Sequence, residues 1–391
     1  MTGIFQLKGQ VKQYDWGGDS FLPQLLGIDN PQHLPFAEYW MGIHPQGPSR
    51  IESVDKHSTY LSEKEPHFSF LLKILDVREM LSIQVHPNRE MAQLDFEREN
   101  RLGIPLNSPE RNYKDPNHKP ELMVALSEFW LLHGFKSPEA LKETFAKYPE
   151  LNPLQAKWEE MGNRGVYQWL MELPQLEVDA WLSVSANNWV NAYEQGALSK
   201  SDPTFWAARA VKSFCKNGKM DRGIFSIFLF NLVKLEKGQG IFQGAGIPHA
   251  YLAGQNVEIM ANSDNVLRGG LTNKYMDVSE LMRHIDTSSI EPRILEPKAD
   301  GVGLRHYPAP VDDFRIQSIL LEAGQEFQYQ AQESLLILAP AGDLEITDGG
   351  ASFHLGSPDL CAYVAANTSF TVRPRTRSLL FIASGHNRSA D

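Results

Sequence analysis

Apolar and polar residues alternate over short stretches through much of the chain, which is the pattern of β-strands. Short apolar runs predict strands at Phe68–Leu75 and Phe228–Leu235. Alternation predicts further strands at Phe314–Ile319 and Leu344–Thr347, and the Asp348–Gly350 segment that follows is typical of a hairpin turn. Strands at such short intervals form sandwiches or barrels. The sequence therefore predicts a mainly β protein.

The pattern changes to a helical one between residues 136 and 222. Ser137-Pro138 and Asp202-Pro203 each place an N-cap residue before a proline suited to the first helical turn. Apolar residues follow both at helical spacing, and residues 178–193 read as another helix. We therefore expect a helical insertion within the β protein. Residues 88–118 are polar and rich in Asn and Pro, which indicates a long excursion outside the core.

These patterns predict four segments. Residues 1–135 and 223–293 are expected to form the two halves of one β-domain, separated by the helical insertion 136–222. Residues 294–391 are expected to form a second β-domain. A length of 391 residues is consistent with two or three domains.

The composition narrows the class of protein. With 37 basic and 48 acidic residues, the net charge of −11 argues against a general affinity for nucleic acid or an anionic membrane. Its two cysteines, Cys215 and Cys361, exclude a disulfide framework and a cysteine-based zinc finger. The N-terminus lacks the features of a signal peptide, and the best apolar run, 224–233, is far shorter than the roughly 20 residues of a membrane span. We expect a soluble, cytoplasmic protein.

Residues able to bind a metal occur at three places. The strand candidate Met80–Val85 leads into His86, and the period of two in a strand puts Gln84 and His86 on one face. Glu121 follows Lys119-Pro120, and His249 follows Ile247-Pro248. Imidazole nitrogen and carboxylate oxygen are ligands for zinc. The spacing alone leaves a metal site and ordinary packed or solvated side chains equally open.

Six segments, taken in order, resemble the type I phosphomannose isomerases, a zinc-dependent branch of the cupin superfamily. They extend over roughly residues 10–278 and are Tyr14–Gly18, Glu38–Pro45, Leu81–Asn88, Tyr113–Glu121, Pro248–Tyr251 and Ser263–Tyr275. The resemblance implies two cupin-type jelly-roll β-domains plus an α-helical domain. It implies one Zn²⁺ per chain, with ligands Gln84, His86, Glu121 and His249.

The same resemblance marks an active-site arginine and a set of cleft residues. They are Arg268, Lys119, His118, Asp264, Lys274 and Trp16. Asn273 departs from the pattern, because relatives often carry proline there, and this loosens the expectation for the loop at Lys274. The similarity assigns no site to residues 300–391.

The implied reaction interconverts mannose 6-phosphate and fructose 6-phosphate through an enediol-like intermediate. It needs a base, a proton route and stabilisation of negative charge. Arg268 and Lys274 suit the phosphate, and Arg268 also suits the enediolate oxygen. The base stays open: Lys119 and His118 come first, with Asp264 and Glu258 as alternatives.

Two other functions also remain open at this stage. One is a cupin-type metal oxygenase, and the other is a non-catalytic sugar-binding cupin protein. In each case the expected partner is a small molecule, with no nucleic acid and no membrane. The chain is expected to be a monomer.

Overall fold

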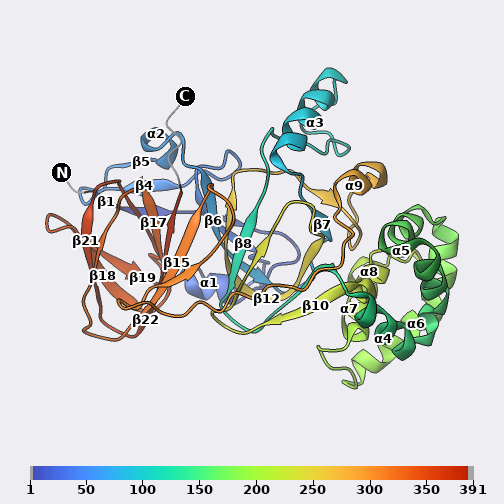
Figure 1. Ribbon diagram of the computed structural model, residues 1–391. Helices are drawn as coiled ribbons and strands as arrows, with labels where there is room; N and C mark the ends of the chain where they lie inside the picture. The colour runs from blue at the N-terminus through green and yellow to red at the C-terminus, as the bar shows by residue number, and fades with distance from the viewer. Residues whose placement is uncertain (1–2, 386–391) are drawn as a thin grey trace.

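A computed structural model describes residues 3–385 and contains three β-sheets and a group of helices (Figure 1). The predicted fold class, mainly β with a helical insertion, is confirmed. The described helices are α1 (Phe21–Leu25), α2 (Leu61–Lys64), α3 (Arg89–Arg101), α4 (Pro138–Lys147), α5 (Asn152–Glu172), α6 (Gln175–Glu194), α7 (Pro203–Phe214), α8 (Ile224–Leu229) and α9 (Val278–His284).

The first sheet has ten strands wound around one interior. They are β2 (Gln10–Lys12), β3 (Glu38–Gly42), β6 (Phe70–Val77), β7 (Gln84–Val85), β8 (Glu121–Ala125), β9 (Phe129–Phe135), β10 (Phe230–Leu235), β11 (Gly240–Gln243), β12 (His249–Ala261) and β13 (Leu267–Arg268).

Strand β12 holds this sheet together because its two halves have different partners. Its first half pairs with β7 and β9, and its second half pairs with β6 and β8. The register with β9 shifts between Tyr251 and Ala253, and Gly254 follows with a φ of 127°. Bulges and glycines of this kind bend a strand so that it can change neighbours. The interior has a polar part near His249, beside a cavity that Leu75 also lines, and an apolar part formed by Met123, Phe129, Leu131 and Ile241.

The second sheet joins the two ends of the chain. Its eight strands are β1 (Ile4–Lys8), β4 (Arg50–Glu52), β5 (Ser58–Tyr60), β14 (Arg305–Tyr307), β15 (Arg315–Leu321), β17 (Leu335–Ala341), β20 (Cys361–Val364) and β22 (Ser378–Ser384). Ile4 lies opposite Val364 in the antiparallel β1–β20 ladder. Strands from the first predicted segment thus share a sheet with strands from the last one, while the domain boundaries themselves stay a prediction.

This eight-stranded sheet is the middle layer of three. Leu336 and Leu338 of β17 pack toward the ten-stranded sheet, in a core with Leu72 and Val257. Leu335 and Ile337 belong to a different core, shared with the third sheet. Alternate residues of a strand point to opposite faces, so a strand in a middle layer is apolar throughout. The third sheet contains β16 (Phe327–Gln330), β18 (Asp343–Thr347), β19 (Ser352–Gly356) and β21 (Ser369–Pro374).

The helical insertion lies at one end of the ten-stranded sheet (Figure 1). The predicted caps are present, because Ser137 accepts a hydrogen bond from the Ala140 amide and Asp202 accepts one from Thr204. α4 and α7 begin at the predicted prolines, and α6 covers the third predicted helix. No helix in the described residues is long and apolar enough to cross a membrane.

Three local predictions differ from the structure. The apolar run that begins at Phe228 starts as helix α8 and becomes strand β10 at Phe230, because a fully apolar run does not distinguish the two. Only Gln84–Val85 of the predicted strand Met80–Val85 forms a strand, although Leu81 and Ile83 also donate backbone hydrogen bonds, to Tyr251 and Gly270. The polar excursion contains helix α3, which Asn88 caps by accepting from the Met91 amide. The predicted hairpin at Asp348–Gly350 is confirmed, since β18 pairs with β19.

Candidate metal centre and substrate cleft

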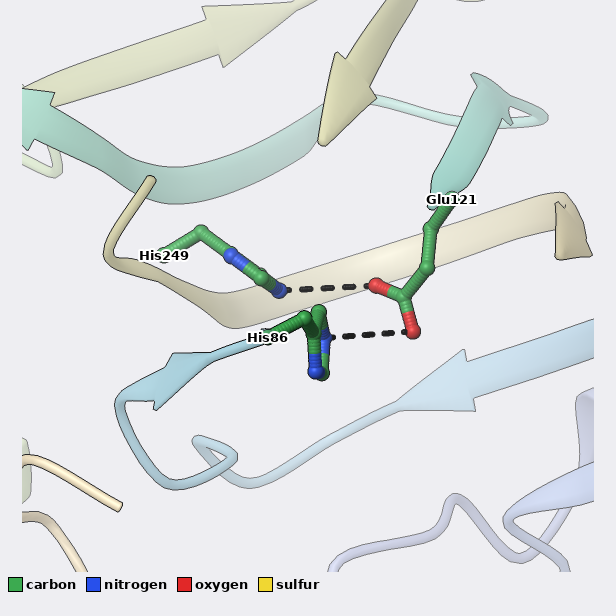
Figure 2. A group of neighbouring side chains, drawn as sticks. All are labelled: His86, Glu121 and His249. Atoms are coloured by element: carbon green, nitrogen blue, oxygen red, sulfur yellow. Dashed lines mark ion pairs between the residues drawn. The ribbon is translucent and has the colours of Figure 1, made fainter. Parts of the chain in front are cut away.

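Two imidazoles and one carboxylate meet at the polar end of the ten-stranded sheet. His249 is the first residue of β12, Glu121 is the first of β8, and His86 follows β7 directly. Figure 2 shows the Glu121 carboxylate directed at both rings. Its Oε1 lies 3.5 Å from His86 Nε2, and its Oε2 lies 3.4 Å from His249 Nε2. These three residues form one of two groups in the described chain that could hold a metal ion.

Strand pairing explains why residues so far apart in sequence converge. His249 lies opposite Gln84 in the β12–β7 ladder, which puts the first residue of one strand beside the segment that leads to His86. Gly246, with a φ of 80°, donates its amide to the His86 carbonyl at 2.9 Å. A Cβ at Gly246 would lie 3.0 Å from the His284 carbonyl oxygen, so the turn before His249 favours glycine.

Backbone carbonyls orient both imidazoles. His86 Nδ1 lies 2.8 Å from the Asn265 carbonyl, and His249 Nδ1 lies 2.9 Å from the Ile247 carbonyl. Each contact leaves Nε2 facing Glu121. His86 Nε2 is buried and has no hydrogen-bond partner among the described residues. A buried nitrogen without a partner, beside a carboxylate and a second imidazole, fits a bound metal ion.

The protonation states also suit metal binding. Burial lowers the pKa of His86 to about 4, so the imidazole is neutral at neutral pH. Burial opposes the charge of Glu121, but Lys119 and His86 hold its pKa well below the ordinary value. The Lys119 ammonium lies 3.0 Å from Glu121 Oε1. A neutral imidazole and an ionised carboxylate are the forms that coordinate zinc.

A cavity of about 60 Å³ lies beside these side chains. Gln84, Glu121 and His249 line it, so the structure brings the amide together with two of the other expected ligands. Lys119 and Glu258 also line it. The expected fourth ligand and two of the expected proton-transfer groups therefore share one space.

Lys73 and Tyr251 line the same cavity, and the sequence did not single them out. Lys73 Nζ lies 3.3 Å from Glu258 Oε2 and 3.5 Å from Glu38 Oε2. Tyr251 donates its hydroxyl to Glu258 at 2.7 Å. One feature of the sequence could have identified Lys73: it is the only lysine in the strand Phe70–Val77. All eight residues of this strand are buried, and its other ionisable residue, Asp76, is near the end. A charged residue in such a strand is rarely there for packing alone.

The surroundings of Lys73 stabilise its positive charge, whereas those of Glu258 oppose its negative charge. Burial opposes its charge, but Glu38, Glu258 and Glu121 together raise the pKa of Lys73. Burial and the charge of Glu121 raise the pKa of Glu258. The cavity therefore combines a permanent cation with a carboxyl group that takes up a proton more readily than usual.

A second group of cations lies at the other side of β7. Arg268 pairs in register with Gln84, is partly buried and has no ion-pair partner among residues 3–385. Burial lowers the pKa of Arg268. Burial, together with the charge of Arg268, lowers the pKa of Lys274. Burial, Arg111 and Arg268 depress the pKa of Lys114, whose ammonium donates to the Leu106 and Ser108 carbonyls. Neighbouring cations that lower one another's pKa create a positive potential, which attracts anions.

The remaining expected cleft residues have other contacts. Asp264 lies 3.3 Å from His44 Nε2 and accepts from the Gln46 amide at 2.9 Å. Trp16 stacks on Tyr14, with 5.9 Å between the ring centroids. His118 has partners outside the metal group: its Nε2 lies 2.9 Å from Asp313 Oδ2 and also contacts Arg89.

The chain matches known proteins over almost its whole length. Residues 4–138 match the family model for the phosphomannose isomerase type I catalytic domain. The chain is 34% identical to mannose-6-phosphate isomerase of Escherichia coli, over 93% of this chain and 95% of that protein. The chain belongs to the type I phosphomannose isomerases.

The similarity to other members extends to solved structures. The Salmonella typhimurium mannose-6-phosphate isomerase is 35% identical over 79% of this chain and 82% of that protein. A crystal structure of the Salmonella enzyme with its substrate, fructose 6-phosphate, and zinc superposes with a TM-score of 0.85 at 29% identity. The match covers 98% of this chain and 100% of that one, and it confirms the cupin-type fold class.

Other crystal structures of the Salmonella enzyme contain single substitutions of a lysine, a histidine and a glutamate. In the order lysine, histidine, glutamate, the substituted positions lie 13 and 35 residues apart along that chain.

Proposed function

We propose that this protein is a metal-dependent aldose–ketose isomerase that interconverts mannose 6-phosphate and fructose 6-phosphate. The observation that carries the proposal is the buried group His86, Glu121 and His249, in which His86 Nε2 has no hydrogen-bond partner in the described residues. This group lies beside a cavity that contains both cationic and carboxyl side chains. Curated relatives carry this activity in their names, and a solved relative contains zinc and fructose 6-phosphate.

Zinc is the metal proposed for this site, with Gln84, His86, Glu121 and His249 as its ligands and one ion per chain. When bound, Zn²⁺ would polarise the substrate oxygens and stabilise developing negative charge. The Asn265 and Ile247 carbonyls support the assignment, because they already orient both imidazoles with Nε2 toward Glu121. Two nitrogens and two oxygens suit a borderline-soft divalent ion.

Lys119 and Glu258 are the groups we assign to proton transfer between C1 and C2. Both line the cavity, and the raised pKa of Glu258 lets its carboxyl group accept and return a proton. Lys73 keeps its charge and offers stabilisation to developing negative charge. The contacts of His118 and Asp264 favour supporting roles, because His118 faces Asp313 and Asp264 faces His44.

A second observation supports the proposed role of Lys73 in the reaction. Lys73, His86 and Glu121 lie 13 and 35 residues apart, the same separations as the lysine, histidine and glutamate substituted in the Salmonella enzyme. We therefore propose that Lys73 contributes to the reaction.

The substrate phosphate is assigned to Arg268 and Lys274, with Lys114 nearby. Burial without an ion-pair partner leaves the Arg268 guanidinium available for two parallel hydrogen bonds to phosphate. Trp16 is proposed as an aromatic wall of the cleft, since it is partly exposed and packs beside Leu75 and Val77.

Metal removal tests the function directly. Purified protein is assayed for mannose 6-phosphate conversion with coupled enzymes, and the metal content of the same sample is measured. Treatment with a strong chelator is expected to abolish activity, because it removes the ion that polarises the substrate oxygens. Added Zn²⁺ is expected to restore the activity. Full activity in metal-free protein would exclude the proposal. Oxygen uptake during turnover would favour a cupin oxygenase instead, and binding without turnover would favour a sugar-binding protein.

We also propose that the enzyme acts as a monomer in the cytoplasm. His86, Glu121 and His249 lie within reach of one ion inside a single chain, and Gln84 lines the adjacent cavity, which supports a site that needs no second copy. Light scattering after gel filtration is expected to give the mass of one chain, 44.1 kDa.

A further inference from the structure

Asp313 connects the two chain segments that carry His86 and Glu121. It lies just before β15, in the part of the chain to which the sequence assigned no site. Its Oδ1 accepts from Arg89 Nη2 at 2.8 Å, and its Oδ2 lies 2.9 Å from His118 Nε2. Arg89 comes three residues after His86, and His118 comes three residues before Glu121. Both contacts are mostly shielded from water, because the Asp313 side chain is only 7% exposed.

We propose that Asp313 is a positioning residue of the metal centre, holding together the segments that deliver His86 and Glu121. This inference rests on the proposed function only in treating those two residues as metal ligands. It gives the C-terminal part of the chain a role in a site whose ligands all lie elsewhere.

The chain segments next to these ligands explain why a cross-link between them is useful. We call the group of Asp313, Arg89 and His118 the clamp. After His86 the chain leaves β7 through Pro87 and Asn88, and Arg89 is the first residue of α3. Before Glu121 the chain is irregular until β8 begins. Arg89 and His118 therefore lie outside the paired strands, although Glu121 itself pairs with Gln243 and Met260. A metal site requires its ligand atoms to stay within about 0.5 Å of the productive geometry, so an additional cross-link is valuable.

The backbone of Asp313 is itself held in place by its neighbours. The Asp313 carbonyl accepts from Ser69 Oγ at 2.7 Å, just before β6. Phe314 is 1% exposed and packs in the core between the ten-stranded and eight-stranded sheets. A carboxylate on this backbone resists displacement of the two side chains that it binds.

The charge distribution strengthens the clamp. Burial opposes the charge of Asp313, but His118 and Arg89 lower its pKa to about 2. The carboxylate is therefore ionised throughout the working pH range, and its hydrogen bonds are charge-assisted.

The test compares Asp313→Asn with Asp312→Asn in the full-length, zinc-loaded protein. Asp312 is the adjacent residue and is exposed, so its substitution removes the same charge without breaking the clamp. Two quantities are measured: the rate of zinc release to a chelator, and kcat and KM for mannose 6-phosphate.

Asp313→Asn is expected to release zinc about tenfold faster and to lose about tenfold in kcat, the low end of the effects seen when groups that support metal ligands are removed. KM is expected to stay within about twofold, because the phosphate assignment rests on Arg268 and Lys274. Asp312→Asn is expected to behave as wild type. Equal zinc release and equal kcat in the two variants would overturn the proposal. So would a loss of thermal stability in Asp313→Asn with unchanged zinc release, because that is the result of a merely structural ion pair.

A second variant covers the case in which Asp313→Asn does not fold. Arg89→Gln removes one arm of the clamp at a partly exposed side chain and is expected to change zinc release in the same direction. Where both fold, the double variant is expected to lose less than the sum of the two single losses, because they break one linked unit. Strict additivity would contradict a clamp. Failure of the proposed function is separate: wild type that turns over no mannose 6-phosphate refutes the function, while the zinc-release comparison still decides the role of Asp313.

Discussion

At the scale of single residues, Lys73 has the most unusual environment in the cavity. Its ammonium lies between two carboxylates and 5.0 Å from the centroid of the Trp40 ring, and its side chain is 8% exposed. The Trp40 indole also donates to Glu38, so the cation, the ring and the acid form one network. Removing one member of a buried charged network leaves the others without compensation.

Lys73→Met is therefore expected to lower the free energy of unfolding by about 3 kcal/mol and kcat by at least about 100-fold. Urea denaturation and the coupled assay measure the two effects. Lys12→Met is a matched control, because Lys12 covers the same ring at 4.5 Å but does not line the cavity. Retained kcat in Lys73→Met would remove its proposed role.

The Arg268 side chain is partly buried, and its guanidinium has no ion-pair partner in the described chain. Arg268→Ala is expected to abolish turnover while zinc content stays near one ion per chain, since the lost group serves the substrate and not the metal. Inhibition by inorganic phosphate is expected to weaken about 100-fold, which follows from the loss of a charge-assisted pair worth about 3 kcal/mol. Arg101→Ala, at the exposed end of α3, is the control. Unchanged phosphate inhibition would place the phosphate elsewhere.

At the scale of elements, the helical insertion meets the ten-stranded sheet at a partly buried lysine. Lys136 directly follows β9, and its ammonium donates to Thr144 Oγ1 at 3.0 Å and to the Phe228 carbonyl at 2.9 Å. No carboxylate within residues 3–385 forms an ion pair with it. Burial, with a smaller effect of Lys147, lowers the pKa of Lys136 to about 8.

This pKa predicts a pH dependence with a definite sign. The unfolded chain holds the proton up to an ordinary pKa of 10.5, whereas the folded chain releases it near 8. The unfolded state therefore binds more protons between these values, and the free energy of unfolding rises with pH across that window by up to about 3 kcal/mol. Lys136→Met is expected to lack this rise in denaturation curves from pH 7 to 10. The exposed Lys142→Met is expected to keep it. Parallel pH profiles for wild type and Lys136→Met would refute the assignment.

The helices also show where the local sequence alone was sufficient to predict the structure. Ser137, Asp202 and Asn88 cap helices through bonds to amides two or three residues away, so the cap residues and prolines at 137–138 and 202–203 marked their helices correctly. Helix α5 was not predicted, and a non-helical residue, Gly162, interrupts it. The boundary between α8 and β10 was misplaced because both sides are apolar and buried, and tertiary packing decides between them.

At the scale of the whole molecule, the eight-stranded sheet makes the two ends of the chain depend on each other. β1 lies between β20 and β4, and β17 supplies one face to each of two cores. Cutting the chain after residue 293 would leave β1 without β20 and would expose Leu72 and Val257, which the removed strands cover.

A fragment of residues 1–293 is therefore expected to aggregate or to lack cooperative unfolding, although it contains every proposed metal ligand. Circular dichroism during thermal unfolding and zinc content measure this. Co-expression with residues 294–391 serves as the control and is expected to recover soluble protein, because the missing strands return. A fragment that unfolds cooperatively and binds zinc would show that the C-terminal part is dispensable.

The sequence by itself determined the side-chain chemistry of this protein. The strand period of two predicted that Gln84 and His86 share a face, and the family resemblance added Glu121 and His249, which the structure brings together with His86. The tertiary structure alone decided the rest: the ring of His118 faces Asp313, Lys73 enters the cavity, and β1 pairs with β20. The physical reason is range. Caps and strand periodicity act over a few residues, whereas these contacts join segments that are close only after the strands have chosen their partners.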